Sequence, residues 1–362
     1  MTAIKSSVQA ELEAILMGQK GKGEGKVEPV KAEDLVVTKL EVVPTVGKVE
    51  FEDIIGKPHP SGKHFFTVHD RTSFPSECQD LIPKVNPKFT EFDLDYALAV
   101  LMAIEYDKPM LAYGPPGTGK SATPEQICAR INYPYMFIQG MGGTEPSDYV
   151  GSPWVSEGSM SWKDGPMSWA AQRPVFLLYD EPFKSSAQTN MCMQSLLDDR
   201  RTLKLYGHPD PVGKGNLKAH KGFRIGLADN VRGVGDGMDK YAAEIQDQST
   251  LNRCKIKVKV DYPQQKTEET IIKAHCPTLP DALVTKMIQV ASKIRAGWKK
   301  GEISMPFTLR DTQEWAEQAV MFGSHELAFK MSYLNGIDGE DDTGSAEVKA
   351  IKDVFKLVGL GI

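Results

Sequence analysis

A glycine-rich stretch at residues 113–121, YGPPGTGKS, has the residue types and spacing needed to hold phosphate groups. Gly114, Gly119, Lys120 and Ser121 fit the pattern G-x-x-x-x-G-K-S. In this pattern the glycines let backbone N–H groups turn toward phosphate oxygens, the lysine reaches the β and γ oxygens, and the serine hydroxyl binds Mg²⁺. The alternative is a structural glycine turn, which would not require lysine and serine at these offsets. The spacing therefore predicts phosphate binding.

The residues expected to contact the nucleotide form one continuous loop and the start of the segment after it. They are Gly114, Pro115, Pro116, Gly117, Thr118, Gly119, Lys120, Ser121 and Ala122. The loop follows a short apolar run at residues 110–113 and precedes a helical pattern at 121–131. A strand before the loop and a helix after it are the context that phosphate binding requires.

Two carboxylates follow the apolar run PVFLLYDE at residues 174–181. Nucleotide hydrolysis needs an acid for the metal and a base for the attacking water. We expect Asp180 to hold Mg²⁺ through water and Glu181 to polarise the attacking water, so loss of Glu181 would harm turnover more than binding. Alone, an Asp-Glu pair is also typical of a solvated strand end, but downstream of a phosphate loop the two motifs support each other.

Three further polar residues are candidates for contact with the reacting phosphate. Asn230 follows the apolar run 223–229, and its amide would orient the water if this strand lies between the strands of the loop and of Asp180. Arg253 and Arg310 are candidates because a guanidinium stabilises the charge on a transferred phosphoryl group. A turn-forming Asp-Asn pair and two surface salt bridges remain the alternatives.

These residues require a scaffold that brings the ends of several strands together. Short apolar runs alternate with helical or loop segments, which is typical of a parallel sheet wrapped by helices. The runs lie at residues 110–113, 134–139, 174–180 and 223–229. After residue 262 the strand signals stop, and apolar residues at helical spacing predict a helical domain. The expected fold is α/β, followed by C-terminal helices.

Three segments follow from this pattern. Residues 1–60 are expected to form a flexible N-terminal arm and linker, because glycine, proline and mixed charge interrupt the periodicity. Residues 61–262 are expected to form the α/β nucleotide-binding domain, and residues 263–362 a helical lid domain.

Two insertions stand out within the α/β part. Residues 151–166 are expected to form a hairpin, for which two interpretations stay open: a hairpin that faces a partner, or an exposed one in which Trp154 and Trp162 pair across the strands. The second insertion, at residues 206–222, carries Lys214, Lys218 and Lys221. Such a charge run is more typical of a solvated face than of a nucleic-acid contact.

Composition restricts the class of protein. The 362 residues are 41% hydrophobic and 25% charged, typical of a folded chain with room for about two domains. The net charge of −5 argues against a protein that coats nucleic acid or a membrane. Neither a signal-peptide core nor a run of about 18 apolar residues is found. The five cysteines are widely spaced, which fits reduced thiols better than a disulfide framework. A cytoplasmic protein without a membrane span is expected.

The order of the motifs resembles the AAA+ ATPases, more narrowly the MoxR group, and within it the ATPase subunit of aerobic cobaltochelatase. The resemblance is carried between residues 82 and 276 by YGPPGTGKS, WKDGPMSWAAQRPVFLLYDE, MQSLLDDRRTL, FRIGLADNVRGVGD and LNRC. It implies an AAA+ P-loop core, with a parallel sheet flanked by helices, and a helical lid domain. It also implies ATP and Mg²⁺ as ligands and hydrolysis in a ring, usually of six copies.

The resemblance also implies roles for the candidate residues. Asn230 is similar to the sensor-1 residue, Arg253 to the arginine finger offered to the neighbouring subunit, and Arg310 to sensor 2. An arginine that acts on a neighbour implies a homo-oligomeric ring. MoxR-like ATPases commonly work with a protein that bears a von Willebrand A domain, so the implied function is ATP-driven remodelling or activation of such a partner.

Other functions remain open. The narrower resemblance makes a subunit of a cobalt chelatase complex an alternative. A motor on nucleic acid would need a basic stripe, which the acidic net charge disfavours. A nucleotide-binding scaffold without hydrolysis is disfavoured by the intact set of Lys120, Asp180 and Glu181.

Two questions of ligand also remain. ATP is favoured over GTP because the sequence has no NKxD-type guanine-reading motif. A zinc site built from His59, His64, His69 and Cys78 is a further alternative, although their spacing matches no standard ligand pattern.

Overall fold

The computed structural model describes residues 45–156, 158–233, 245–337 and 345–362. Two compact units are distinguished by their packing. The first contains the described residues up to Val85, with Phe92–Gly114 and Gly119–Val260. The second contains Asn86–Glu91, Pro115–Thr118 and Asp261–Ile362. The main segment of the second unit begins close to the boundary that the sequence predicts after residue 262.

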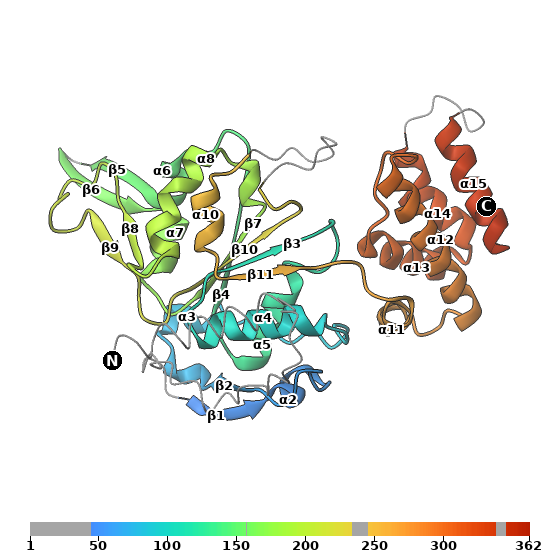
Figure 1. Cartoon of the computed structure of the whole chain (residues 1–362), viewed down its shortest axis with the longest axis horizontal. Coiled ribbons are helices and arrows are strands. Elements are labelled where there is room, and N and C mark those ends of the chain that lie inside the picture. The colour runs from blue at the N-terminus through green and yellow to red at the C-terminus, as the bar shows by residue number, and fades with distance from the viewer. Residues whose placement is uncertain (1–44, 157, 234–244, 338–344) are drawn as a thin grey trace, which may run out of the picture. The chain divides into compact units, whose positions relative to one another are not determined.

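A five-stranded parallel sheet forms the centre of the first unit (Figure 1). The strand order is β11-β3-β10-β7-β4. The strands are β3 (Met110–Tyr113), β4 (Tyr135–Gln139), β7 (Phe176–Asp180), β10 (Arg224–Asp229) and β11 (Ile256–Lys259). The four predicted strands are confirmed. β11 is not among them, because its sequence IKVK alternates apolar and charged residues.

The register of the sheet brings the ends of three strands together. β10 lies between β3 and β7, with Asp229 aligned to Tyr113 and Ala228 aligned to Asp180. Because neighbouring strands are parallel, the residues that follow each of them lie at the same end of the sheet, next to the carboxyl ends of the strands. The order that the sequence analysis required for Asn230 is therefore present.

Helices cover both faces of this sheet. On one face α4 (Leu94–Glu105) packs against β3, β10 and β11, with α5 (Ala122–Ile131) beside it (Figure 1). On the other face lies α7 (Pro166–Ala171). This arrangement confirms the predicted α/β class with a sheet flanked by helices.

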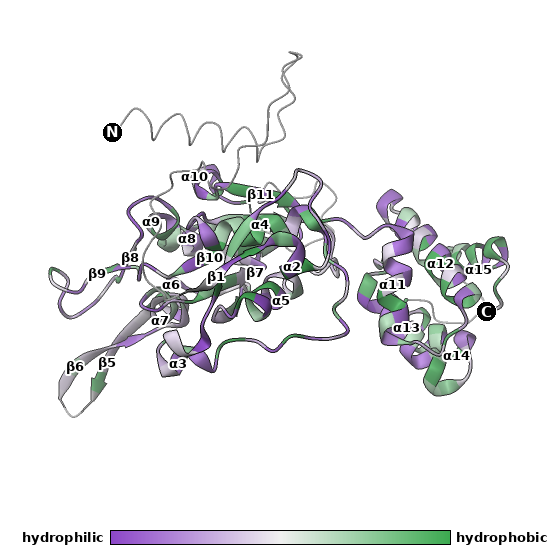
Figure 2. Cartoon of the chain, turned by 90° about the horizontal axis from the view of Figure 1, so that it is seen from below, coloured by the Kyte–Doolittle hydropathy of each residue, from purple (hydrophilic) through white to green (hydrophobic). Residues whose placement is uncertain are grey.

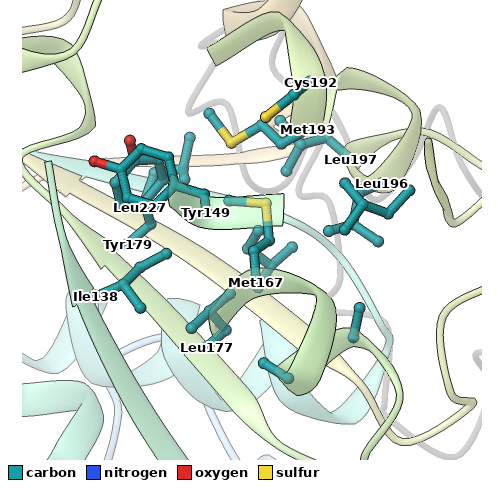
Figure 3. Packing of buried hydrophobic residues seen from close by; sticks show 14 of the residues in the cluster. Ile138, Tyr149, Met167, Leu177, Tyr179, Cys192, Met193, Leu196, Leu197 and Leu227 are labelled. Carbon is teal, nitrogen blue, oxygen red and sulfur yellow. The ribbon is translucent and has the colours of Figure 1, made fainter. Parts of the chain in front are cut away.

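Alternate residues of the strands point into the core beneath α7. Leu177 and Tyr179 of β7 pack with Met167 of α7 and with Tyr149, whose ring centroid lies 5.1 Å from that of Tyr179 (Figure 3). All four side chains are buried. Since every second residue of a strand faces the same side, this cluster holds β7 in one register and so fixes where the strand ends.

Residues 45–60 differ from the predicted flexible arm. β1 (Thr45–Glu50) pairs antiparallel with β2 (Phe65–His69), and the short helix α2 (Phe51–Ile55) follows β1 directly. The phenylalanine and both isoleucines of α2 are buried, so this segment gains stability by packing on the first unit. The rest of the predicted arm, residues 1–44, lies outside the described residues.

Short helices connect the larger elements of the first unit. They are η1 (Arg71–Ser73), α3 (Ser76–Gln79), α6 (Pro146–Val150), η2 (Pro182–Lys184), α8 (Ala187–Asn190), η3 (Met191–Met193), α9 (Gln194–Leu197) and α10 (Gln248–Arg253). Both insertions form two-stranded hairpins. They are β5 (Gly151–Ser156) with β6 (Ser159–Asp164), and β8 (Thr202–Lys204) with β9 (Asn216–Lys218).

The first hairpin is exposed, but its two tryptophans are not paired. Figure 2 shows it extending away from the body of the first unit, as predicted for an exposed insertion. The predicted pairing of its two tryptophans is wrong. The register places Trp154 opposite Ser161 and Trp162 opposite Pro153. Because directly opposed residues share a face and consecutive residues do not, the two indole rings lie on opposite faces of the hairpin.

The second unit is helical, as predicted. It contains α11 (Gln265–His275), α12 (Asp281–Lys300), α13 (Leu309–Phe322), α14 (His325–Ser332), η4 (Leu334–Gly336) and α15 (Ala346–Val358). Phe307, Trp315 and Phe329 form its aromatic core. A buried ion pair, with Arg295 nitrogens 2.7 and 2.8 Å from the Glu268 carboxylate oxygens, joins α11 to α12.

Candidate nucleotide-binding site

The glycine loop leaves the sheet at the end of β3. Gly114 has a φ of +152°, and a Cβ added there would lie 1.9 Å from the carbonyl oxygen of Val260. Gly119 has a φ of +84°, which a residue with a side chain rarely adopts. Both glycines are therefore required for the loop to turn closely over the sheet edge and deliver the next residue, Lys120, to the site.

Lys120 is buried at the base of this loop. Its Nζ donates hydrogen bonds to Gly114 O at 2.8 Å and to Asn230 Oδ1 at 3.0 Å. Tyr96 of α4 donates a hydrogen bond to the carbonyl of Lys120 and so fixes its backbone. Burial lowers the pKa of Lys120 to about 8, although the charge of Asp180 and other nearby carboxylates opposes this shift. The ammonium is poorly solvated, which favours a strong interaction with phosphate oxygens.

Ser121, directly before α5, and Asp180, the last residue of β7, lie side by side. Ser121 Oγ donates a hydrogen bond to Asp180 Oδ2 at 2.8 Å. Burial raises the pKa of Asp180, and the hydrogen bond from Ser121 partly offsets that effect. A hydroxyl and a carboxylate oxygen are hard donors of the kind Mg²⁺ prefers, and Mg²⁺ completes its shell with water and phosphate oxygens. The residues present therefore fit this metal.

Glu181 is the residue directly after β7, and its backbone adopts a left-handed conformation with φ +50°. Its N–H donates to Ala228 O at 2.7 Å, which holds this uncommon turn. Its carboxylate accepts a hydrogen bond from Gln139 Nε2 at 2.9 Å and lies 2.7 Å from Lys184 Nζ. Burial alone would raise the pKa of Glu181, but these two contacts outweigh it and lower the pKa. Glu181 is therefore ionised at neutral pH and able to accept a proton.

Asn230 bridges the lysine and the glutamate. Its Oδ1 accepts the hydrogen bond from Lys120, and its Nδ2 lies 3.4 Å from Glu181 Oε1. The preceding residue, Asp229, is buried and accepts hydrogen bonds from the N–H groups of Phe183 at 2.9 Å and Val231 at 3.1 Å. Burial raises the pKa of Asp229 to about 6, in spite of these hydrogen bonds. Asp229 thus ties the turn after Glu181 to the end of β10.

Arg253 lies at the opposite end of the sheet from this cluster, where the strands begin. It ends α10, and two residues later the N–H of Lys255 donates to Pro109 O at 2.8 Å, just before β3 begins. The glycine loop starts only after β3 has ended at Tyr113. With a rise of about 3.3 Å per residue, the four-residue strand β3 separates the two ends of the sheet by roughly 13 Å. Arg253 is therefore not part of the cluster around Lys120 in its own chain.

Arg310 belongs to the second unit, where it is exposed in the first turn of α13. The preceding Thr308 caps this helix, because its side chain accepts a hydrogen bond from the N–H of Asp311 and the Asp311 carboxylate accepts one from the N–H of Thr308. The structure gives Arg310 a defined helix position within that unit, and its role remains a proposal.

Four residues around the cluster are not predicted by the sequence: Tyr96, Gln139, Asp229 and Lys184, which lies three residues after Glu181 and forms an ion pair with it. Tyr96 and Gln139 lie on other elements and reach the site only through the fold. Asp229 stands next to a predicted residue, but a turn-forming aspartate and a buried structural one look alike in a sequence. A burial signal was present for Asp229, since it ends a run of apolar residues.

The alternative zinc residues are used in other ways. His59 contacts Ser61 at 2.7 Å and Asp95 at 3.2 Å, and Ser61 also contacts His64 at 2.7 Å. His69 packs against two aromatic rings, and Cys78 is a buried free thiol. Within the ranges that the structure describes, no group of three or more metal-ligating side chains is found.

A parallel sheet, a glycine loop with a buried lysine, and two strand-end carboxylates beside it define a P-loop nucleotide-binding domain. Residues 109–240 match the family model of the AAA domain, dynein-related subfamily. The aerobic cobaltochelatase subunit CobS of Sinorhizobium is 28% identical over 71% of this chain and 78% of its own length. Protein CbbQ of Hydrogenophilus thermoluteolus is 27% identical over 52% of this chain and 65% of its own length.

Two further matches were found, one to a much longer protein and one to a solved structure. Midasin of Giardia intestinalis is 28% identical over 58% of this chain, which spans only 4% of midasin. Among solved structures, the Thermotoga maritima RuvB Holliday junction branch migration motor has 14% identity and a TM-score of 0.41, covering 76% of this chain and 72% of that one. At that TM-score the likeness supports no functional conclusion.

The predicted resemblance to the AAA+ ATPases of the MoxR group is thereby confirmed, with an AAA domain matched over residues 109–240. Nucleotide binding follows from that domain. In the part of the chain that the structure describes, no helix has both the length and the apolar character needed to cross a membrane.

Proposed function

We propose that this chain hydrolyses ATP with Mg²⁺ in a homo-oligomeric ring, most simply a hexamer, and uses the energy to remodel or activate a protein partner. The proposal rests on one observation: Lys120, Asp180, Glu181 and Asn230 lie together at the carboxyl ends of the central strands. Each of these side chains has the chemistry that its proposed role in phosphoryl transfer requires.

The loop and Lys120 would bind the phosphates. Backbone N–H groups between Gly117 and Ala122 would donate to the phosphate oxygens, because Pro115 and Pro116 have no N–H and that of Gly114 donates to Asp229 O at 3.2 Å. The N-terminus of α5 adds the positive end of its dipole. The Lys120 ammonium would exchange its hydrogen bond with the Gly114 carbonyl for one with a phosphate oxygen. Mg²⁺, held by Ser121 and through water by Asp180, would supply neutralising charge on the phosphates.

Glu181 would act on the attacking water. Its carboxylate is ionised and already oriented by Gln139 and Lys184, so it can accept a proton without reorganisation. Asn230 lies between Glu181 and Lys120, where an amide can hold the water in line with the γ-phosphate. Turnover therefore depends on Glu181 and Asn230 more than nucleotide affinity does.

The arginines would complete the site. Arg253 lies at the end of its own sheet that is opposite the phosphate loop, so it is suited to reach the phosphate held by a neighbouring copy. Such a contact in every copy requires a ring or another closed assembly. Arg310 is proposed to contact the nucleotide from the helical unit. ATP is preferred over GTP because the sequence has no guanine-reading motif.

A protein with a von Willebrand A domain is the proposed partner. One relative carries the name von Willebrand factor A domain-containing protein 8, from Mus musculus, and is 22% identical over 60% of this chain. A subunit of a metal chelatase is the second candidate, because a cobaltochelatase subunit matches 71% of the chain. Nucleic acid is disfavoured as a partner by the net charge of −5.

The test compares wild type, Glu181→Gln and a matched control, Glu52→Gln, which makes the same change at an exposed position of α2. We expect the wild type and the control to hydrolyse ATP in the presence of Mg²⁺. The Glu181→Gln variant should bind ATP with similar affinity but turn it over at least about a hundredfold more slowly. Equal turnover by Glu181→Gln and wild type would refute the proposed base.

A further inference from the structure

Arg253 has an environment that is incomplete within its own chain. Its Nη1 donates a hydrogen bond to the carbonyl of Ser249 at 2.7 Å, one helical turn earlier. Its Nε is buried and has no hydrogen-bond partner among the described residues. A guanidinium with an unused donor at a partly buried position can still donate a hydrogen bond to a phosphate or carboxylate oxygen.

Among the residues that the structure describes, this guanidinium forms an ion pair with Asp198. The distance from Arg253 Nε to Asp198 Oδ2 is 3.7 Å, which is an ionic contact but too long for a hydrogen bond. Only 26% of the Arg253 side chain and 21% of the Asp198 side chain are exposed, so solvent screens this pair less than a surface pair. Arg253 is also one of the charges that lower the pKa of Asp198, after the larger effect of Arg200.

Asp198 is itself held firmly. Arg200 donates to both of its carboxylate oxygens from its side chain, and the backbone N–H of Arg200 donates to Asp198 Oδ1 at 2.9 Å. The adjacent Arg201 is anchored by hydrogen bonds to Leu196 O of α9 and to Phe223 O, directly before β10. The carboxylate therefore has a fixed position from which it can orient a neighbouring cation.

The helices that carry the two residues are also joined directly. Gln194 of α9 donates hydrogen bonds to Ser249 Oγ at 3.0 Å and to Thr250 Oγ1 at 2.8 Å, both on α10. Asp198 directly follows α9, and Arg253 is the last residue of α10. The spacing between the carboxylate and the guanidinium is thus set by the packing of α9 on α10.

We propose that Asp198 is the positioning residue that aims Arg253 at the phosphate of the neighbouring subunit's nucleotide. The inference rests on the proposed function, because it requires that Arg253 act on a neighbour. An ionic contact without a hydrogen bond orients the guanidinium and uses none of its donors, so the N–H groups that do not donate to Ser249 O stay available for the phosphate. Asp198 touches neither nucleotide nor water, and it acts only through Arg253.

The test uses mixed oligomers, because they separate action on a chain's own site from action on its neighbour's. Glu181→Gln has a dead site but an intact Arg253, whereas Arg253→Ala has an intact site but no finger. Mixing these two inactive variants should restore ATP hydrolysis, since Arg253→Ala sites receive a finger from Glu181→Gln neighbours. This control contains no change at Asp198, so it tests the proposed neighbour contact alone.

Asp198→Asn is then mixed with each of the two variants. By itself it should hydrolyse ATP about ten- to a hundredfold more slowly than wild type, as expected when a reacting group is misplaced. Mixing with Glu181→Gln should restore activity, and mixing with Arg253→Ala should not, because neither chain then presents an aimed finger. The matched control Asp199→Asn, the same change at the exposed adjacent position, should hydrolyse ATP like wild type.

Several outcomes would overturn the inference. Rescue of Asp198→Asn by Arg253→Ala instead of Glu181→Gln would place the effect in the chain's own site. Wild-type activity of Asp198→Asn, or rescue by neither variant, would also refute it. If the control mixture itself fails while wild type hydrolyses ATP, Arg253 does not act on a neighbour, and both this inference and the proposed ring contact are wrong.

Folding is controlled separately. Asparagine keeps the Oδ1 that accepts the N–H of Arg200, so the local turn should persist and the thermal midpoint should match that of Asp199→Asn. If Asp198→Asn is unstable, Asp198→Glu restores the charge one methylene further out. That variant should show the same pattern of rescue with a smaller loss, and a different pattern would count against the inference.

Discussion

The pH dependence of nucleotide binding should report the charge of Lys120. Burial lowers its pKa to about 8, and only the charged ammonium interacts strongly with phosphate. With that pKa, about 90% of the chains carry a charged Lys120 at pH 7 and about 10% at pH 9. Affinity follows the fraction of binding-competent chains, so we expect the Kd for ATP to rise roughly tenfold between these values.

The assay is a titration with a fluorescent ATP analogue and Mg²⁺ from pH 7 to 9, using the non-hydrolysing Glu181→Gln protein. Loss of affinity cannot come from loss of the fold through Lys120. Its folded-state pKa lies below the ordinary value of 10.5, so the unfolded chain binds more protons between about pH 8 and 10.5, and this group makes the unfolding free energy rise there. When Lys120→Arg is combined with Glu181→Gln, the charge at position 120 does not titrate in this range, and the Kd for the ATP analogue should stay constant from pH 7 to 9. A Kd that is equally constant with Lys120 present would refute the reasoning.

The remaining predictions concern single side chains. Glu268→Ala should lower the unfolding free energy of the helical unit by about 3–5 kcal/mol in urea denaturation, because Arg295 is left as a buried unpaired charge; a loss below 1 kcal/mol would contradict this. Asp229→Ala removes acceptors from two backbone N–H groups and should cost about 2–4 kcal/mol in the same assay. Asn230→Ala should reduce ATP turnover about a hundredfold while its calorimetric Kd changes less than about threefold. Tyr96→Phe should cost about 1 kcal/mol, measured by thermal unfolding, since one hydrogen bond to the loop is lost.

The parts of the site that could be predicted are those in which chemistry fixes local spacing. The offsets among Gly114, Lys120 and Ser121 follow from the shape of a phosphate group, so a single stretch of sequence is enough. Asp180 and Glu181 could be proposed from the sequence because they stand at the end of an apolar strand and directly after it. The place of Asn230 could be predicted only as a condition, since the order of strands in a sheet depends on contacts far apart in the chain.

The parts that could not be predicted depend on register and packing. Gln139 contacts Glu181 only because β4 pairs with β7 and both strands end at the same level. The two hairpin tryptophans have the spacing of a pair, but the register that separates them onto opposite faces is set by the turn. The few apolar residues of segment 45–60 are buried because β1 pairs with β2 and α2 packs on α5, and both contacts join segments that lie far apart in the sequence.

The most direct test of the account is the rate of ATP hydrolysis per chain as a function of protein concentration, with the mass followed by light scattering. If a neighbouring copy completes each site, the rate per chain should rise with concentration and level off as the mass approaches six protomers of 39.9 kDa. A rate per chain that stays constant down to the monomer would contradict the account, because each chain would then hold a complete catalytic site.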